Sequence, residues 1–397
     1  MAVGDVCRLR LQSIVQGGDA LARFEGKPFF IKGGAPSDTA LCRITEDRKN
    51  WVRAELLEIV EYSPARESSA QNESLCAFYS LCGGCNLAHI NYESQLVAKT
   101  AILKELILRA AGIPAPEPLI FRSPPQGYRN RMQFHCFRQN MKSDSKLKFG
   151  LMEQKSGKIA AITDCPVAEK GIRLMLKQGG NIPLPPEKDR FNVFSKDGLF
   201  LNEGGIQRGK IRLLEKDIIL DAGLFFQSNC FMLEALIQEL RKIAMTADRD
   251  LPAADLYSGV GTFAFFLSEL FPKIILAEEN KTAVSIAREN LKGKNADFFA
   301  LRDSQWQNSF LQRKSIFGFA VVDPPRTGLS AKLAAALSQE GPPVLVYISC
   351  DPASLARDSK ILVTGGYKLI KLNLFDFYPQ TAHIESLAVF EKKRHGF

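Results

Sequence analysis

A chain of 397 residues is long enough for two or three domains, and it can bury roughly 75% of the surface that its unfolded form exposes. Its charged fraction of 24% and hydrophobic fraction of 46% exclude a disordered or fibrous protein, and its short apolar runs and the polar start Met1–Asp5 predict a cytoplasmic protein that does not enter a membrane. The net charge of +9 favours a polyanionic partner, although charge alone does not separate RNA from DNA or an acidic membrane surface.

Residues 1–63 alternate apolar and polar positions around glycine turns at 17–18 and 33–34. Short strands joined by such turns predict a small closed β-barrel of the oligonucleotide-binding type, whose lysines and arginines could contact phosphates. A small β-domain without a ligand is the alternative. The polar segment 63–73 breaks the alternation and predicts the end of the first domain at residue 63.

Three of the nine cysteines lie within ten residues, at Cys76, Cys82 and Cys85, and Cys165 is a candidate for a fourth member of the group. Cytosolic thiols stay reduced, so this clustering indicates metal binding more than disulfides. The glycines at 83–84 permit the tight turn that three ligands on one short loop require. Four sulfurs suit zinc or a 4Fe-4S cluster, and the spacing alone leaves that choice open.

An amphipathic helix is predicted over 92–111, because apolar residues recur at helical spacing and Gly112 and Pro114 then end the pattern. Strand-like alternation follows from 128 to 213. We therefore predict a central β-rich domain over 64–224, which contains the cysteine loop and Cys165.

After residue 225 the spacing of the apolar residues along the sequence changes. Ser228 or Asn229 is the predicted N-cap of an amphipathic helix, and strands then alternate mostly with helices, which predicts a seven-stranded, doubly wound α/β domain over 225–397. The predicted strands are 253–257, 273–278, 296–301, 318–322, 344–348, 367–374 and 383–391.

Groups that suit the binding of a nucleoside cofactor stand at the ends of four successive predicted strands. The first strand leads into the glycine turn 259–261, which has two of the three glycines of a dinucleotide fingerprint. Glu278 or Glu279 ends the second strand about 20 residues later, where a carboxylate can accept hydrogen bonds from ribose hydroxyls. Asp303 and Asp323 follow the third and fourth strands. No phosphate-loop lysine is present, so S-adenosylmethionine fits this site better than ATP.

Cys350 lies between the buried strand 344–348 and a helix that Pro352 opens. A thiol just before a helix N-terminus, at the carboxyl end of a strand in an open α/β sheet, is placed where ligands gather and where the helix field favours a thiolate. This placement suits a nucleophile. Taken alone, the same cysteine could equally serve as a small apolar packing residue.

Several motifs together resemble the RNA uracil-C5 methyltransferases, which form 5-methyluridine in rRNA or tRNA. The resemblance covers nearly the whole chain, because residues 4–63 are similar to the TRAM domain of that family. At Ser258 many members have cysteine. The segments that carry the resemblance are 127–131, 226–229, Asp255–Phe263, Asp323–Arg326, Ser349–Pro352 and His383–Ser386.

The resemblance implies two bound groups. Cys76, Cys82, Cys85 and Cys165 match the ligands of a 4Fe-4S cluster, to which we assign a structural role because four cysteine ligands leave no open iron position. Glu278 is preferred to Glu279 because it stands 12 positions before Asn290, the spacing of the family. The residues implied to contact S-adenosylmethionine are Gln227, Tyr257, Thr262, Glu278, Asp303 and Asp323.

The resemblance also implies a mechanism, in which the Cys350 thiolate adds to C6 of uracil and Glu385 later removes the proton from C5. C5 of uracil is otherwise too weak a nucleophile to attack a methyl sulfonium. A free thiol has a pKa of about 8.5, so we expect neighbouring basic groups such as Arg326 to lower the pKa of Cys350. For Glu385 we expect a base with a raised pKa.

The expected partner is RNA with the target base in a loop or flipped out, held by the barrel and by segment 128–131. We favour 23S rRNA, with tRNA as the alternative, and no obligate protein partner is evident. An amino-group methyltransferase would also use an Asp-Pro-Pro loop, but Arg326 stands where an aromatic residue is wanted, and that reaction needs no cysteine. An inactive RNA-binding protein would not need the full set of catalytic residues.

Overall fold

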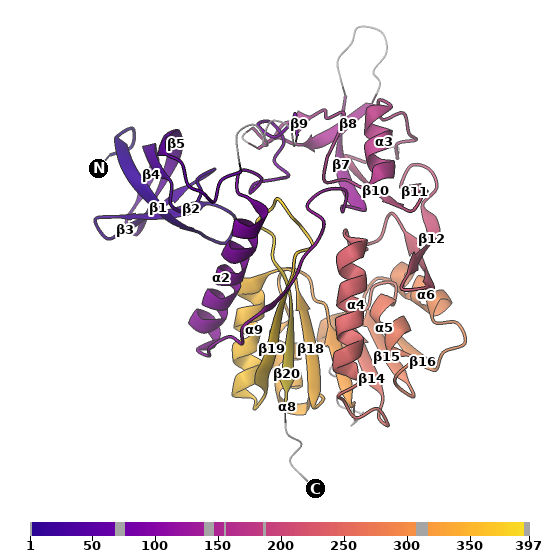
Figure 1. Ribbon diagram of the computed structural model, residues 1–397. Helices are drawn as coiled ribbons and strands as arrows, with labels where there is room; N and C mark the ends of the chain where they lie inside the picture. Colours follow the sequence, from indigo (N-terminus) through magenta and orange to yellow (C-terminus); the bar gives the residue numbers. More distant parts are fainter. Residues whose placement is uncertain are drawn as a thin grey trace. The chain divides into compact units, whose positions relative to one another are not determined.

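The computed structural model describes residues 2–67, 76–138, 147–154, 156–185, 188–306 and 317–392 (Figure 1). It divides into two compact units. The first unit comprises the described residues of 1–102, 137–166 and 378–383, and the second comprises those of 103–136, 167–377 and 384–397. The predicted boundary segment 63–73 is described only to residue 67, and its remainder lies outside the described residues. Among the described helices, none is long and apolar enough to span a membrane.

The first unit begins with a closed five-stranded barrel in the order β1-β2-β3-β5-β4, which confirms the predicted barrel. Alternate residues of β1 point inward, as in Leu9 and Leu11, and they pack with Phe29 and Ile31 into the barrel core. Closure leaves no unpaired strand edge. The strands are β1 (Val6–Ile14), β2 (Ala20–Phe24), β3 (Lys27–Ile31), β4 (Thr39–Arg48) and β5 (Trp51–Glu61).

A helix and a small hairpin complete the regular structure of this unit. The helix α2 (Tyr92–Ala111) has the predicted bounds, and the division between the units falls within it, after Ile102. The strand β8 (Leu147–Met152) pairs antiparallel with β9 (Ile159–Ala160). The cysteine loop is attached to this hairpin, because the N–H of Gly83 donates to the carbonyl of Met152 at 2.9 Å.

The central part of the second unit is mainly β-structure, as predicted. Within this unit, β7 (Arg131–Arg138) pairs antiparallel with β10 (Arg190–Lys196), which pairs with β11 (Leu199–Asn202). A separate hairpin joins β12 (Arg208–Leu213) to β13 (Lys216–Asp221).

The helix α3 (Lys170–Lys177) interrupts this region, where we expected strand-like structure throughout. It begins at Glu169, whose carboxylate accepts from the N–H of Gly171. Its apolar face buries Ile172, Met175 and Leu176, a spacing typical of a helix and not of a strand.

The rest of the second unit is an α/β domain on an eight-stranded sheet in the order β16-β15-β14-β17-β18-β20-β19-β6 (Figure 1). All seven predicted strands are present: β14 (Ala253–Leu256), β15 (Ile274–Glu278), β16 (Ala296–Ala300), β17 (Phe319–Val322), β18 (Val344–Ser349), β19 (Lys368–Phe375) and β20 (Glu385–Glu391). The first five run parallel, and β20 lies antiparallel between β18 and β19. Every residue of β14, β17 and β18 is buried, as expected for strands covered on both faces.

The eighth strand, β6 (Leu119–Phe121), comes from outside the predicted seven-stranded domain and pairs parallel with β19. Phe121 stacks on Phe375 with ring centroids 4.1 Å apart. Only three residues long and not fully buried, this strand has too little pattern to predict.

Six helices accompany the sheet: α4 (Cys230–Ala244), α5 (Thr262–Leu267), α6 (Lys281–Asn290), α7 (Asp303–Trp306), α8 (Ala331–Glu340) and α9 (Pro352–Thr364). Two of them begin as predicted. Asn229 caps α4 by accepting from the N–H of Met232, and α9 opens on Pro352 with Asp351 as its N-cap.

Candidate active site

The candidate active site lies at the carboxyl ends of the parallel strands. The strands β14, β15, β17 and β18 run in the same direction, so their carboxyl ends meet at one rim of the sheet. Tyr257, Asp323 and Cys350 directly follow three of these strands, and Glu278 is the last residue of β15. Cys350 is therefore on the same rim as the glycine turn, as the proposed chemistry requires.

Strand register brings Cys350 and Glu385 together. In the antiparallel pair β18–β20, Ser349 lies opposite Ser386. One residue beyond this last pair, the same register leads to Cys350 and Glu385, and the charge of Glu385 acts on the thiol. Glu385 is buried, whereas Cys350 is only partly buried. The sulfur can thus meet a substrate while the acid behind it is shielded from water.

The thiol of Cys350 is not acidic. Burial, followed by the charges of Glu385 and Asp323, raises its pKa to about 12. Arg326 acts in the expected direction and lowers the pKa, but it is exposed and does not offset the other effects. The expectation that basic neighbours give Cys350 a lowered pKa is therefore wrong for the protein without substrate.

Glu385 holds its proton more tightly than an ordinary carboxyl group. Burial raises its pKa well above the usual value, the charge of Asp323 raises it further, and Arg326 opposes both. The raised pKa agrees with the expectation for a carboxyl group that acts in proton transfer.

Two of the residues expected to contact the cofactor meet each other. The Gln227 side-chain amide donates to Oδ2 of Asp323 at 3.2 Å. Burial raises the pKa of Asp323 to about 7, and this hydrogen bond opposes the shift. Gln227 is fixed because it stands two residues before the Asn229 cap of α4. The segment before α4 thereby reaches the rim of the sheet.

Tyr257, Asp303 and Glu278 gather around the glycine turn. Tyr257 has a φ of +63°, unusual for a residue with a side chain, and its hydroxyl donates to Oδ2 of Asp303 at 3.2 Å. Glu278 accepts from the N–H of Gly259 at 3.1 Å. Thr262 is buried at the first position of α5. The six residues expected to contact the cofactor thus all lie on the rim.

Asp255 is a rim residue to which we assigned no role, although it opens one of the recognised motifs. It is fully buried, and its Oδ2 accepts from the N–H of Ala264 at 2.8 Å. Burial raises its pKa to about 8. Its Oδ1 and the hydroxyl of Ser258 are buried with no hydrogen-bond partner among the described residues. Unpaired polar atoms at the glycine turn fit a polar ligand held there, as S-adenosylmethionine would be.

The four cysteines expected to bind metal all belong to the first unit. In the loop, the N–H of Cys82 donates to the carbonyl of Phe78, and the N–H of Gly84 donates to Sγ of Cys82 at 3.4 Å. Among the residues that the structure describes, no three His, Cys, Asp or Glu side chains are grouped so as to hold a metal ion. The arrangement does not by itself form a metal site, and the ligand set Cys76, Cys82, Cys85 and Cys165 stays a prediction.

Comparisons with known proteins agree with this geometry. The family model described as tRNA (Uracil-5-)-methyltransferase matches residues 214–393, and the TRAM domain model matches residues 3–57. An uncharacterized RNA methyltransferase of Treponema denticola is 32% identical over 97% of this chain and 98% of its own length. The chain belongs to the RNA uracil-C5 methyltransferase family. It is an S-adenosylmethionine-dependent RNA (uracil-C5)-methyltransferase with an N-terminal TRAM domain, as the motifs predicted.

Two further relatives extend the comparison. The 23S rRNA (uracil(1939)-C(5))-methyltransferase RlmD of Vibrio parahaemolyticus is 28% identical over 94% of this chain and 93% of its own length. The crystal structure of Pyrococcus abyssi tRNA (uracil-54, C5)-methyltransferase, in complex with S-adenosyl-L-homocysteine, has a TM-score of 0.73 and 24% identity, and the match covers 96% of this methyltransferase and 99% of that chain. The second comparison confirms the fold of the family.

Proposed function

We propose that this methyltransferase modifies a uridine of 23S rRNA through a temporary covalent bond between Cys350 and C6 of the base. The strand register that leads from the pair Ser349 and Ser386 to Cys350 and Glu385 carries the proposal, because a thiol beside a carboxyl group suits a nucleophile with a proton acceptor. The choice of rRNA rests on the curated relatives of similar length, such as the RlmD protein of Vibrio parahaemolyticus. A tRNA uridine is the alternative.

The reaction uses Cys350 to activate C5. S-adenosylmethionine, when bound, supplies the methyl group. Sγ of Cys350 gives up its proton to water and bonds to C6, so the C5–C6 π electrons move into an enolate. With S-adenosylmethionine bound, C5 would use that electron pair to bond to the methyl carbon, while the bond between that carbon and the sulfonium sulfur breaks and S-adenosylhomocysteine is left. Glu385 in its ionised form then takes the C5 proton, the electrons of the C5–H bond re-form the C5–C6 double bond, and the C6–sulfur bond breaks with its electrons returning to Sγ.

The high pKa of the Cys350 thiol fits a nucleophile that stays neutral until the substrate arrives. With a pKa of about 12, the thiol is almost entirely protonated at neutral pH. Its proton must leave as the bond to C6 forms. The neighbouring carboxyl groups of Asp323 and Glu385 are the groups whose charges the thiol experiences most strongly, so loss of charge on either one favours the thiolate.

RNA that contains 5-fluorouridine tests the covalent step. Fluorine at C5 leaves Glu385 no proton to remove after methyl transfer, so the enzyme should remain bonded to the RNA. We expect a complex that survives denaturation and maps by mass spectrometry to the peptide containing Cys350. A complex attached to another residue, or full turnover without any complex, would contradict the proposal. Mass mapping of 5-methyluridine in the rRNA and tRNA of cells lacking this protein tests the choice of RNA.

The proposal also includes a structural 4Fe-4S cluster held by Cys76, Cys82, Cys85 and Cys165. It is supported by the three cysteines on one short loop, the turn at Gly83 and Gly84, and the membership of all four cysteines in one unit. Iron and acid-labile sulfide measured on protein purified without oxygen test this part: four of each per chain support it, and zinc without sulfide contradicts it.

A further inference from the structure

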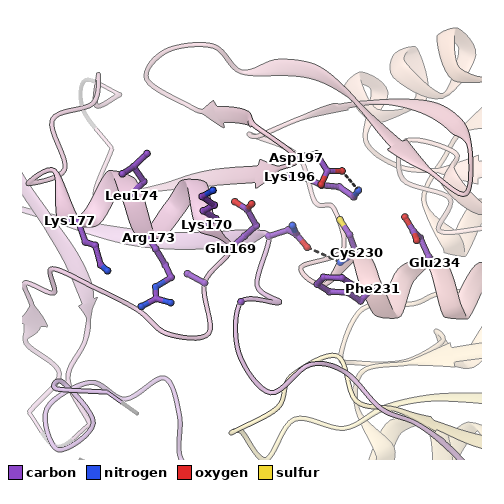
Figure 2. A pocket seen from close by; sticks show the side chains of 13 residues that line it. Glu169, Lys170, Arg173, Leu174, Lys177, Lys196, Asp197, Cys230, Phe231 and Glu234 are labelled. Carbon is purple, nitrogen blue, oxygen red and sulfur yellow. Dashed lines mark hydrogen bonds and ion pairs between the residues drawn. The ribbon is translucent and has the colours of Figure 1, made fainter. Parts of the chain in front are cut away.

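A pocket of about 480 Å³ lies in the second unit, between α3 and the first turn of α4 (Figure 2). We call it the α3–α4 pocket. Lys170, Arg173 and Lys177 line it from α3, and Phe231 and Glu234 line it from α4. The methyl-transfer chemistry described above uses none of these five residues.

The walls of the pocket are joined by hydrogen bonds that do not need a ligand. Oδ1 of the buried Asn130 accepts from the N–H of Cys230, and its Nδ2 donates to the carbonyl of Ser195, both at 2.8 Å. The N–H of Glu169 donates to the carbonyl of Arg129 at 2.9 Å. The segments that carry α3 and α4 are therefore fixed to the same two residues, which directly precede β7, and the pocket is formed in advance.

The α3 side of the pocket is cationic. Positions 170, 173 and 177 follow the i, i+3, i+7 spacing of one helix face, so all three positive side chains reach the same wall. Glu169, which caps α3, and Asp197, which pairs with Lys196, also line the pocket. This wall suits a phosphate group.

The α4 side offers an aromatic ring and a hydrogen-bond acceptor. Phe231 is 54% exposed although it is a large apolar residue, and Glu234 lies three residues further along the helix. Exposed aromatic rings beside positive charge are the usual contacts of unpaired nucleotides. A carboxylate accepts hydrogen bonds from the exocyclic amino group of cytosine, a group that uracil lacks. Four residues before Phe231, Gln227 contacts Asp323 at the rim of the sheet, so the chain that enters α4 runs from the rim to the pocket.

We propose that the α3–α4 pocket binds an unpaired nucleotide that flanks the target uridine in the RNA. The inference rests on the proposed function and adds a second binding position for the same substrate. The phosphate lies against Lys170, Arg173 and Lys177. The base stacks on Phe231, and its exocyclic amino group donates to Glu234, which favours cytosine over uracil.

Binding of short cytidine and uridine ribo-oligonucleotides to the full-length protein, measured across a range of salt concentrations, tests the inference. Phe231→Ala should weaken binding of both by about 5- to 150-fold, the measured range for one stacked base, without changing the salt dependence. Arg173→Gln should reduce the slope of log affinity against log salt by about 0.7, which corresponds to one lost phosphate contact.

Glu234→Ala separates base recognition from a simple effect of charge. We expect it to lower the preference for the cytidine oligonucleotide by about tenfold. If Glu234 acted only as a negative charge near the phosphate, its removal would strengthen binding of both oligonucleotides equally, and recognition of the amino group would be refuted.

A control keeps the test separate from a general loss of charge. Lys332→Gln removes an exposed positive charge from α8 and should leave both affinities unchanged. If Phe231→Ala and Arg173→Gln both bind within about twofold of the parent, the nucleotide pocket is refuted, while the 5-fluorouridine experiment still decides the role of Cys350.

Discussion

The rim of the methyltransferase sheet and the cysteine loop 76–85 place their reactive side chains in different ways. At the rim, Cys350 and Glu385 stand at the ends of two hydrogen-bonded strands, so backbone register fixes which residues face each other. In the loop, turns and a few backbone hydrogen bonds hold the cysteines, and the described side chains do not form a metal group. A site at strand ends is complete without its ligand, whereas a site on a loop needs the ligand to assemble it.

The largest effect should come from removing the sulfur at the rim. We expect Cys350→Ala to reduce methyl transfer at least about 10⁴-fold, because without the bond to C6 the uracil C5 is too weak a nucleophile. Transfer of labelled methyl groups to RNA measures the loss. Cys136→Ala, which removes a partly buried cysteine that we place outside the site, is the matched control and should keep full activity.

Removing the carboxyl group of Glu385 should reduce methyl transfer by a smaller factor. Glu385→Gln keeps the shape of the side chain but cannot accept a proton, so we expect turnover to fall by about 10²- to 10⁴-fold. RNA without fluorine should then remain attached to Cys350 after the methyl group has been transferred, and a denaturing gel should detect the complex. Glu391→Gln, at the far end of the same strand β20, should show neither effect.

A substitution in the cysteine loop should change the stability of the protein and not the rate of methyl transfer. If a cluster assembles the loop, Cys82→Ala should lose iron and sulfide and lower the free energy of unfolding by roughly 4 kcal/mol or more. Thermal unfolding and metal analysis together measure this. A Cys82→Ala protein that unfolds as the parent does and methylates RNA normally would show that the loop needs no cluster.

The rate at which the Cys350 thiol reacts should depend on pH, because neighbouring groups at the rim set its pKa. With a thiol pKa of about 12, alkylation of Cys350 by iodoacetamide should accelerate about tenfold for each pH unit from neutral pH upward. Asp323→Asn removes a negative charge and should make alkylation faster at a given pH, whereas Arg326→Gln removes a positive charge and should make it slower. Mass spectrometry of the Cys350 peptide gives the rates, and a plateau near pH 9 would contradict the raised pKa.

The last prediction concerns the pH dependence of folding. Asp255 has its pKa raised from 3.8 to about 8 in the folded protein, so it binds a proton more tightly there than in the unfolded chain. Its contribution to stability is therefore complete below about pH 4 and is lost as pH rises toward 8, by about 1.4 kcal/mol per pH unit. Asp255→Asn should flatten this dependence in urea unfolding measured across that range. An unchanged pH profile would show that Asp255 does not titrate in this way.

Much of the fold followed from the sequence because its signals are local. The seven strands of the sheet are buried runs bounded by turns, and the caps Asn229 and Asp351 stand beside their helices. Once the strands are parallel, the residues after them must share one rim, so the membership of the candidate site could be predicted before any distance was known.

The features that escaped prediction depend on distant parts of the chain. The helix α3 lies among strand-like segments, and its apolar face becomes evident only when Ile172, Met175 and Leu176 are seen to pack inward. The pKa of Cys350 depends on groups from two other parts of the sheet, and the balance between one exposed arginine and two carboxyl groups cannot be read from spacing.

The short strand β6 has a practical consequence for anyone who isolates the catalytic half of this enzyme. A fragment that starts at residue 225 would keep the motifs from 226–229 onward but would expose the hydrogen-bonding edge of β19 and the ring of Phe375. Bare sheet edges recruit other strands, so such a fragment should self-associate. A soluble catalytic fragment must therefore retain the stretch around Leu119–Phe121, which lies well upstream of that starting point.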